Sequence, residues 1–171
     1  MKTFSRIIGS VSLVIVAFFL IGVFVNRISY NIELTLDRPA HQVFNSITNR
    51  KLQKQWVNGL QSSELIKGPD KAEGAIYAVR VLDGSRTIQI IEQIERLEPD
   101  SLLEYAIETN GIEGRVIIQL INQEKTSLLR ITTELEGTVW FMKSLLPLLK
   151  HTLYERDLRD YKKFKSLLRT A

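Results

Sequence analysis

Apolar and polar residues alternate along much of this chain, and the alternation predicts antiparallel strands. From Tyr30 to Leu36 every second side chain is apolar, which is the period of a strand with one buried face. Similar alternation or a short apolar run recurs in residues 62–67, 75–82, 86–97, 103–108, 116–120 and 129–135. Short turn sequences such as Asp83-Gly84 join these segments, so neighbours in sequence are expected to pair in one sheet. The Ile90-Ile91 step predicts a β-bulge.

Apolar residues recur at helical spacing in three other places. Two short helices are predicted after the first strand, one beginning at Pro39 and one running from Arg50 to Leu60. A long helix is predicted from Thr138 to Arg169, and Pro147 is expected to kink it or to separate a short first segment. Only this long helix is large enough to cover the inner face of the sheet. The predicted fold class is therefore α+β, a curved antiparallel sheet of about six or seven strands wrapped on a long C-terminal helix.

The first part of the chain has a different character. The run from Ile7 to Val25 carries no charge, and as a helix it would span roughly 28 Å, close to the ~30 Å hydrocarbon core of a bilayer. A cleaved signal peptide usually has a shorter apolar region and a small-residue cleavage site, which is missing here. The run therefore predicts a single transmembrane helix, with a membrane anchor (1–27) and a domain (28–171) held close to the membrane. The flanking basic residues favour, by one or two charges, a domain on the non-cytoplasmic side.

The segment NIELTLDRPAHQVFNSITNRKLQKQWVNGL resembles the opening of the START-like, or SRPBCC, superfamily, which includes polyketide cyclase/dehydrase-like proteins and the birch pollen allergen group. That opening is a strand, a proline-started helix with Val-Phe and a short helix with a tryptophan, matched here by Pro39, Val43, Phe44 and Trp56. The later hairpins and the helix HTLYERDLRDYKKFKSLL fit the ending, so the resemblance covers Tyr30 to Leu168. It implies a helix-grip fold with an apolar cavity between sheet and C-terminal helix, used mainly to hold lipids, sterols or other apolar ligands. It carries over no catalytic residue, because the superfamily has no universal one.

Composition removes several kinds of chemistry. The chain has no cysteine, which excludes disulfides, thiolate metal sites and cysteine nucleophiles. Its two histidines, His41 and His151, do not form a metal-binding motif, and no cofactor-binding motif is present, so neither metal nor cofactor is expected. The net charge of +4 is mild and much of it lies near the C-terminus, so nucleic acid is not an expected partner. Of the strand carboxylates, Glu92 shares the parity of apolar neighbours and is the candidate acid or base.

The walls of the expected cavity supply the candidate ligand-binding residues. Tyr77 and Tyr105 lie on the inward parity of their strands, where each offers an apolar ring and a hydroxyl that needs a partner. Filling of the core is the alternative role for each ring. The candidates are Trp56, Tyr77, Val79, Ile90, Tyr105, Ile107, Ile118, Leu145 and Leu149.

Three functions remain in competition at this stage. The leading hypothesis is a membrane-anchored domain that binds a lipid or other hydrophobic small molecule without catalysis. The second is a cyclase- or hydratase-like enzyme, which needs a carboxylate or histidine in the pocket. The third is a module that binds another membrane protein through the stretch from Trp140 to Leu149. This stretch is apolar nearly all round, so it is expected to touch either lipid or the core.

Overall fold

Seven strands form one antiparallel sheet in the computed structural model, which describes residues 12–14, 16–20, 22–123 and 125–170. The strands are β1 (Arg27–Leu36), β2 (Leu60–Lys67), β3 (Ile76–Asp83), β4 (Arg86–Glu98), β5 (Leu102–Thr109), β6 (Ile112–Gln123) and β7 (Thr126–Gly137). Their order across the sheet is β1-β7-β6-β5-β4-β3-β2, so β2 to β7 pair as consecutive neighbours and β1 pairs with β7. The α+β class and the sheet of about seven strands are confirmed.

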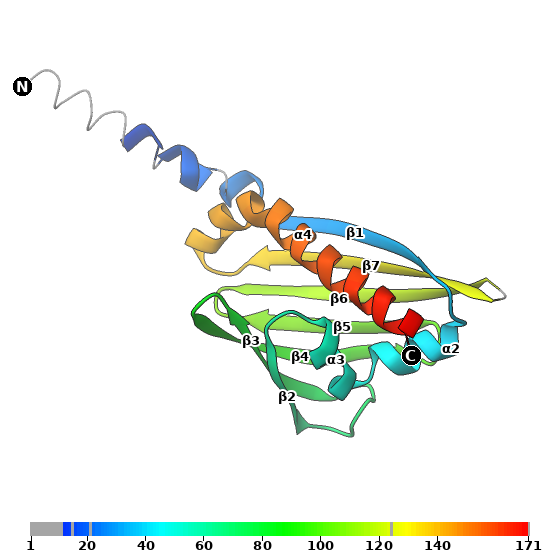
Figure 1. Ribbon diagram of the computed structural model, residues 1–171. Coiled ribbons are helices and arrows are strands. Elements are labelled where there is room, and N and C mark those ends of the chain that lie inside the picture. The colour runs from blue at the N-terminus through cyan, green and yellow to red at the C-terminus, as the bar shows by residue number, and fades with distance from the viewer. Residues whose placement is uncertain (1–11, 15, 21, 124, 171) are drawn as a thin grey trace, which may run out of the picture.

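The helices lie on one face of this sheet (Figure 1). Two short helices, α2 (Ala40–Ile47) and α3 (Arg50–Trp56), follow β1, and α4 (Trp140–Thr170) follows β7. Helix α4 runs diagonally across the sheet, contacts β1 and β7, and brings its C-terminal end beside α2 and α3. The sheet therefore grips one long helix, as the resemblance implied.

The alternation in the sequence determines which side chains form the core. On β7, Leu129, Ile131 and Thr133 are buried against the helices. From α4, the ring of Phe164 is fully buried and lies 5.1 Å from the ring of Trp56 on α3. Burial of such side chains stabilises the fold by about 1.5–3 kcal/mol each, which fixes α4 and α3 relative to the sheet.

Several local predictions are corrected by the structure. Helix α3 ends at Trp56 rather than Leu60, because Gly59 adopts a left-handed backbone (φ 77°) that turns the chain into β2. The register between β3 and β4 is regular at Ile90-Ile91; the irregularity lies instead between Ile94 and Arg96, where β4 pairs with β5. Helix α4 continues through Pro147 without division, and the fully buried Leu146 holds that turn against the sheet.

The predicted membrane localisation is contradicted. Within the described ranges no helix is long and apolar enough to cross a membrane. The long helix α4 carries many charged residues. A span requires about 20 consecutive apolar residues in one helix. Part of the run from Ile7 to Val25, namely 7–11, 15 and 21, lies outside the described residues.

The apolar run instead contacts the first turns of α4. The rings of Phe19 and Trp140 stack with centroids 3.9 Å apart, and Phe18 lies 5.7 Å from Phe141. The backbone of Gly22 lies so close to Ser144 that an added side chain would collide with it. Trp140 is still 66% exposed, so only part of this surface is covered by the described residues.

Candidate functional site

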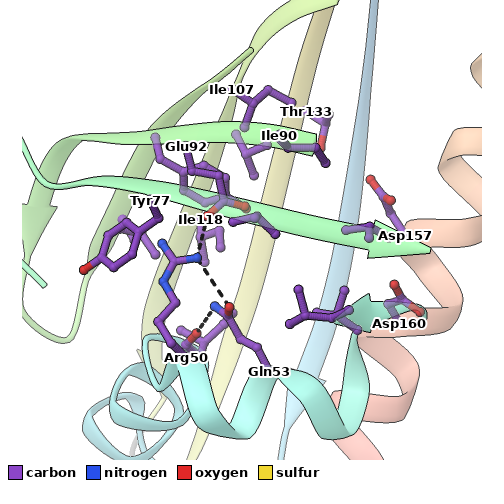
Figure 2. Close-up of a pocket in the computed structure, with 18 of the residues that line it drawn as sticks. Arg50, Gln53, Tyr77, Ile90, Glu92, Ile107, Ile118, Thr133, Asp157 and Asp160 are labelled. Carbon is purple, nitrogen blue, oxygen red and sulfur yellow. Dashed lines mark hydrogen bonds and ion pairs between the residues drawn. The ribbon is translucent and has the colours of Figure 1, made fainter. Parts of the chain in front are cut away.

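A cavity of about 200 Å³ lies between the inner face of the sheet, α3 and α4 (Figure 2). Strands β3 to β6 give it a mainly apolar wall that includes Val79, Ile90, Ile107 and Ile118. Two groups of polar side chains interrupt this wall. Arg50 and Glu92 lie at one end, and Asp157 and Asp160 project from α4 at the other.

Most of the candidate residues from the sequence meet in this wall. Those lining the cavity are Trp56, Tyr77, Val79, Ile90, Tyr105, Ile107 and Ile118. Leu145 and Leu149 do not line it; both are half-buried near the beginning of α4. The inward residue of that turn is Leu146, which packs in a separate cluster with Ile28 and Leu135. Contact of the seven lining residues with a ligand stays a prediction.

The ion pair between Arg50 and Glu92 occupies one end of the cavity. Arg50 Nη1 donates to Glu92 Oε2 at 2.5 Å and lies 3.4 Å from Gln53 Oε1. Their side chains are only 17% and 14% exposed, and the guanidinium also stacks 4.1 Å from the ring centre of Tyr77. Burial disfavours the charged guanidinium, but attraction to Glu92 outweighs it and raises the pKa of Arg50. Gln53 donates to the carbonyl of Ile47, which ties this end to the α2–α3 corner.

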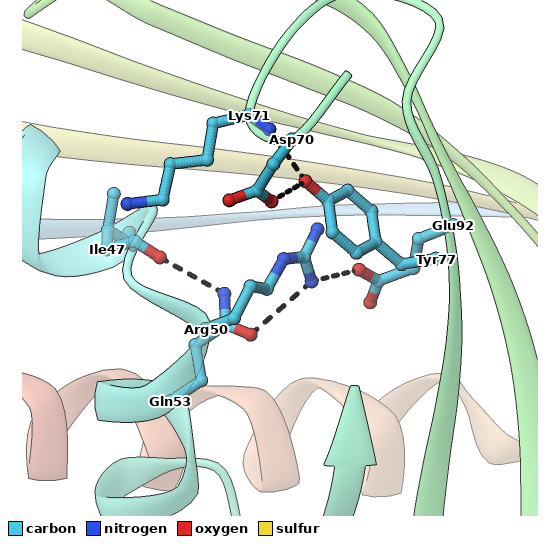
Figure 3. A network of polar contacts seen from close by, with 7 residues as sticks. All are labelled: Ile47, Arg50, Gln53, Asp70, Lys71, Tyr77 and Glu92. Carbon is cyan, nitrogen blue, oxygen red and sulfur yellow. Dashed lines mark hydrogen bonds and ion pairs between the residues drawn. The ribbon is translucent and has the colours of Figure 1, made fainter. Parts of the chain in front are cut away.

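Tyr77 connects the pair to the loop between β2 and β3 (Figure 3). Its hydroxyl donates to Asp70 Oδ1 at 2.7 Å and accepts from the backbone N–H of Lys71 at 2.8 Å. Burial raises the pKa of Tyr77, so its hydroxyl stays protonated. The loop is therefore fastened over the Arg50 end of the cavity by a side chain that also contacts Arg50.

The opposite end of the cavity is formed by α4 and β1. The hydroxyl of Tyr30 donates to Asp157 Oδ2 at 2.7 Å, and Arg156 approaches the other carboxylate oxygen at 3.5 Å. One turn further on, Asp160 accepts from the backbone N–H of Asn58 at 3.2 Å. Burial raises the pKa of both Asp157 and Asp160, and for Asp160 the neighbouring Asp157 adds to the effect.

Aromatic side chains with polar groups complete the α4 end. Burial raises the pKa of Tyr105 and Tyr161 well above the ordinary value, so both present neutral hydroxyls. The ring of Trp56 lies 5.5 Å from that of Tyr161 and is 5% exposed. Its indole N–H has no acceptor among the described residues. This end of the cavity thus combines half-buried carboxylates with neutral tyrosine hydroxyls.

Comparison with known proteins places the chain in a family. Residues 27–163 match the family model described as polyketide cyclase / dehydrase and lipid transport. The chain belongs to this family. No curated protein matches it.

Solved structures share the fold of this polyketide cyclase/dehydrase-family chain. The crystal structure of Ara h 8.0201 superposes with a TM-score of 0.70 at 14% identity, covering 85% of this chain and 99% of the other. A conserved protein from Geobacillus kaustophilus gives 0.70 at 15% identity (84% and 96% covered). An aromatase/cyclase from Streptomyces gives 0.66 at 8% identity (84% and 94% covered). These likenesses confirm the START-like helix-grip fold, and at such low identity they show the fold alone.

Three polar residues of the site were not among the candidates from the sequence. The sequence pattern assigns no role to Asp157 or Asp160, and Arg50 enters it only as the first residue of the predicted second short helix. A signal existed for Arg50, because a cation at a helix N-terminus opposes the helix dipole and needs another partner. Glu92, the one strand carboxylate with inward parity, does line the cavity. The described residues contain no group of side chains suited to a metal ion.

Proposed function

We propose that this chain binds a compact, largely apolar molecule whose oxygen atom is held by Arg50. The observation that carries the proposal is the guanidinium in the wall of an apolar cavity. Only its Nη1 has hydrogen-bond partners among the described residues, and Figure 3 shows its other terminal nitrogen without one. A guanidinium N–H in such surroundings is a strong donor to an oxygen. Membership of the family and the helix-grip fold support binding of a hydrophobic ligand.

The charge of the site favours a neutral oxygen over a carboxylate. Glu92 already balances Arg50, so the pair carries no net charge. A ligand carboxylate beside Glu92 would place two negative charges next to each other in a largely apolar wall, which is unfavourable. A ketone oxygen accepts the same hydrogen bond without adding charge. The ligand class is therefore an apolar ring or short chain with a carbonyl group.

The size of the cavity limits the ligand to about one substituted ring. A cavity of roughly 150 Å³ with apolar walls accepts benzene. The cavity here measures about 200 Å³, which leaves room for a ring and a short chain. Benzylacetone, a phenyl ring with a ketone chain, is a suitable probe, and butylbenzene is the matching hydrocarbon.

Isothermal titration calorimetry of the purified chain tests the proposal with three probes. Benzylacetone is expected to bind about tenfold more tightly than butylbenzene, since a hydrogen bond to a charged donor contributes roughly 1.5–3 kcal/mol before the carbonyl is desolvated. Phenylpropanoate is expected to bind more weakly than benzylacetone. In the double variant Arg50→Met/Glu92→Leu, which removes both charges together, butylbenzene should still bind and the ketone should lose its advantage.

The control is Asp37→Asn, a surface change in a side chain 56% exposed and remote from the cavity. It should leave all three affinities unchanged. Failure of every probe to bind, or an equal advantage for the ketone in the double variant, would overturn the proposal.

A second candidate function is proton transfer on the bound ketone, favoured by the position of Glu92 beside Arg50. The carboxylate would take a proton from the carbon next to the carbonyl, leaving an enolate whose oxygen Arg50 stabilises; return of the proton restores the ketone. In D₂O this exchange would place deuterium on that carbon. Proton NMR of benzylacetone with wild type and with Arg50→Met/Glu92→Leu measures it. Exchange no faster than without protein would exclude this activity.

A further inference from the structure

The two edges of the sheet differ in how well they are protected from further strand pairing. Figure 1 shows β2 at one border of the sheet and β1 at the other. Strand β2 has eight residues, two irregularities in its register with β3 and a lysine at its end, all features that discourage pairing with another chain. Strand β1 has ten residues in regular register with β7 and contains neither lysine nor proline. The edge of β1 is therefore open to another strand.

Backbone groups of alternate residues in β1 point toward this open edge. The N–H of Gly137 at the end of β7 donates to the carbonyl of Asn26 at 3.2 Å, and the next residue, Thr138, donates to Gly111 beside β6 at 2.8 Å. In an antiparallel pair, residues that bond to the neighbouring strand alternate with residues whose N–H and C=O point away from it. The even-numbered residues of β1 therefore bond to β7, and the odd-numbered residues of 27–35 direct their N–H and C=O to the edge. Within the described ranges no strand pairs with them.

The side chains of β1 complement one another in one antiparallel register. A two-fold axis at Tyr30 places Arg27 opposite Glu33 of a second copy, and the symmetry repeats this contact. Ser29 then lies opposite Asn31 of the second copy, so odd residues oppose odd residues, as the outward backbone groups require. An axis at Asn31 would instead place Glu33 opposite Ser29 and leave the charges unmatched. Charge thus selects the register centred on Tyr30.

The two charged side chains are accessible and already belong to ion pairs on the outer face of the sheet. Arg27 is 77% exposed and bonds to Glu136 on β7, and Glu33 is 52% exposed and bonds to Arg130 on the same strand. Across two paired copies these side chains would form rows of alternating charge that extend over four strands. Such a network stabilises more than an isolated surface pair does.

We infer that two copies of this chain associate through antiparallel pairing of their β1 edges, in the register centred on Tyr30. The two seven-stranded sheets then form one continuous sheet, with the helices of both copies on the same face. The contact is isologous and uses the same edge of each copy, so association ends at a dimer.

Sedimentation velocity of the full chain at low salt tests the association. Wild type is expected to reach twice the 19.6 kDa of one chain. Asn31→Pro removes an N–H that points to the edge, so the bonds between β1 and β7 should remain while the protein becomes monomeric. Thr35→Pro is the matched control, because its N–H points to the same edge but lies outside the paired residues 27–33. This variant should stay dimeric.

Charge reversal tests the register. Arg27→Glu and Glu33→Arg each place like charges opposite one another in a homodimer, so each variant alone should dimerise at least about tenfold more weakly than wild type. Mixed in equal amounts, the two variants regain opposite charges at every contact between copies. Native mass spectrometry of the mixture should then detect the heterodimer well above either homodimer.

Three results would overturn the inference. The first is a wild type that stays monomeric up to about 100 µM. The second is a dimer that persists in Asn31→Pro, which would assign association to another surface, such as the exposed side chains of Trp140 and Phe141. The third is a mixture of the charge variants with no excess of heterodimer. Thermal unfolding of each variant verifies that a lost dimer does not come from a lost fold.

Discussion

The ion pair at the end of the cavity provides a direct test of how the charges are held. Removing Arg50 alone as Arg50→Met leaves the Glu92 carboxylate, 14% exposed, without its cation. Breaking a buried pair from one side typically costs 3–5 kcal/mol, whereas replacing both members by apolar residues is often neutral. The contact of Arg50 with the ring of Tyr77 at 4.1 Å is lost as well. Each single variant is therefore expected to lose at least about 2 kcal/mol of unfolding free energy.

The double variant Arg50→Met/Glu92→Leu is expected to lie within about 1 kcal/mol of wild type. The coupling between the two residues would then be at least about 3 kcal/mol. Urea denaturation followed by far-UV circular dichroism measures all four proteins, with equal m-values required for the comparison. The matched control is the surface pair Arg130–Glu33, at 2.7 Å but 41% and 52% exposed, whose coupling should stay below about 1 kcal/mol.

Two results would refute this reasoning. Single variants at Arg50 and Glu92 that lose less than about 0.5 kcal/mol would show that water screens the pair as it does at a surface. A double variant as unstable as the sum of the singles would show that the two side chains act independently. Either result would also remove the electrostatic argument for a neutral ligand oxygen.

Three further changes test other parts of the site. Phe164→Ala removes a fully buried ring beside Trp56 and should cost about 3–5 kcal/mol in urea denaturation, because it leaves a void in the core; a loss below about 1 kcal/mol would contradict the packing described. Tyr77→Phe removes the hydroxyl that holds Asp70, so amide hydrogen exchange should accelerate in the loop 68–74 and not in β7. Asp157→Asn should raise the unfolding temperature at pH 7, because burial raises the pKa of Asp157 above 3.8 and ionisation therefore disfavours the folded state. This advantage should shrink as the pH falls through the folded pKa and vanish below about 4; an advantage independent of pH would contradict it.

The order of β2 to β7 and the inner face of the sheet follow from the sequence because alternation and short turns are local signals, whereas the pairing of β1 with β7 joins segments far apart in the chain. In β7, Leu129, Ile131 and Leu135 occupy the positions that parity assigns to them. The register irregularity of β4 was placed at Ile90-Ile91, but it lies between Ile94 and Arg96. The alternation of inward and outward side chains indicates that a strand contains an irregularity, but it does not give the position. Any position between two runs of inward residues fits the same alternation.

The α4 end of the site was harder to predict, because it depends on which face of a helix meets a cavity. Between Leu153 and Phe164 the inward face of α4 carries Asp157 and Asp160 beside the buried Tyr161. A helix that packs on a solid core would carry apolar side chains there. Polar residues within a buried helix face are therefore a sequence signal for a cavity. Only the curvature of the sheet shows which of these polar positions faces the cavity.

The membrane prediction failed for a related reason. Hydropathy treats an apolar run as if its partner were lipid, but the run before β1 finds part of its contact on α4, where Phe19 stacks on Trp140. Among the described residues no helix meets the requirements of a span. The two most apolar segments of the chain were thus interpreted separately, although they lie against each other in the fold.

The charged side chains of the cavity contrast with the apolar packing of α4 against the rest of the sheet. Beside Phe164 the interior is fully buried and apolar, so the chain is able to pack α4 tightly against the sheet. At the cavity it instead retains a buried ion pair and two carboxylates disfavoured by burial, an arrangement less stable than well-packed apolar side chains of similar volume. Retaining these polar groups reduces stability without improving packing, and a ligand oxygen that accepts from Arg50 would compensate for part of this loss. The apolar double variant at Arg50 and Glu92 should therefore keep its stability while losing its preference for a ketone, which separates the requirements of folding from those of binding.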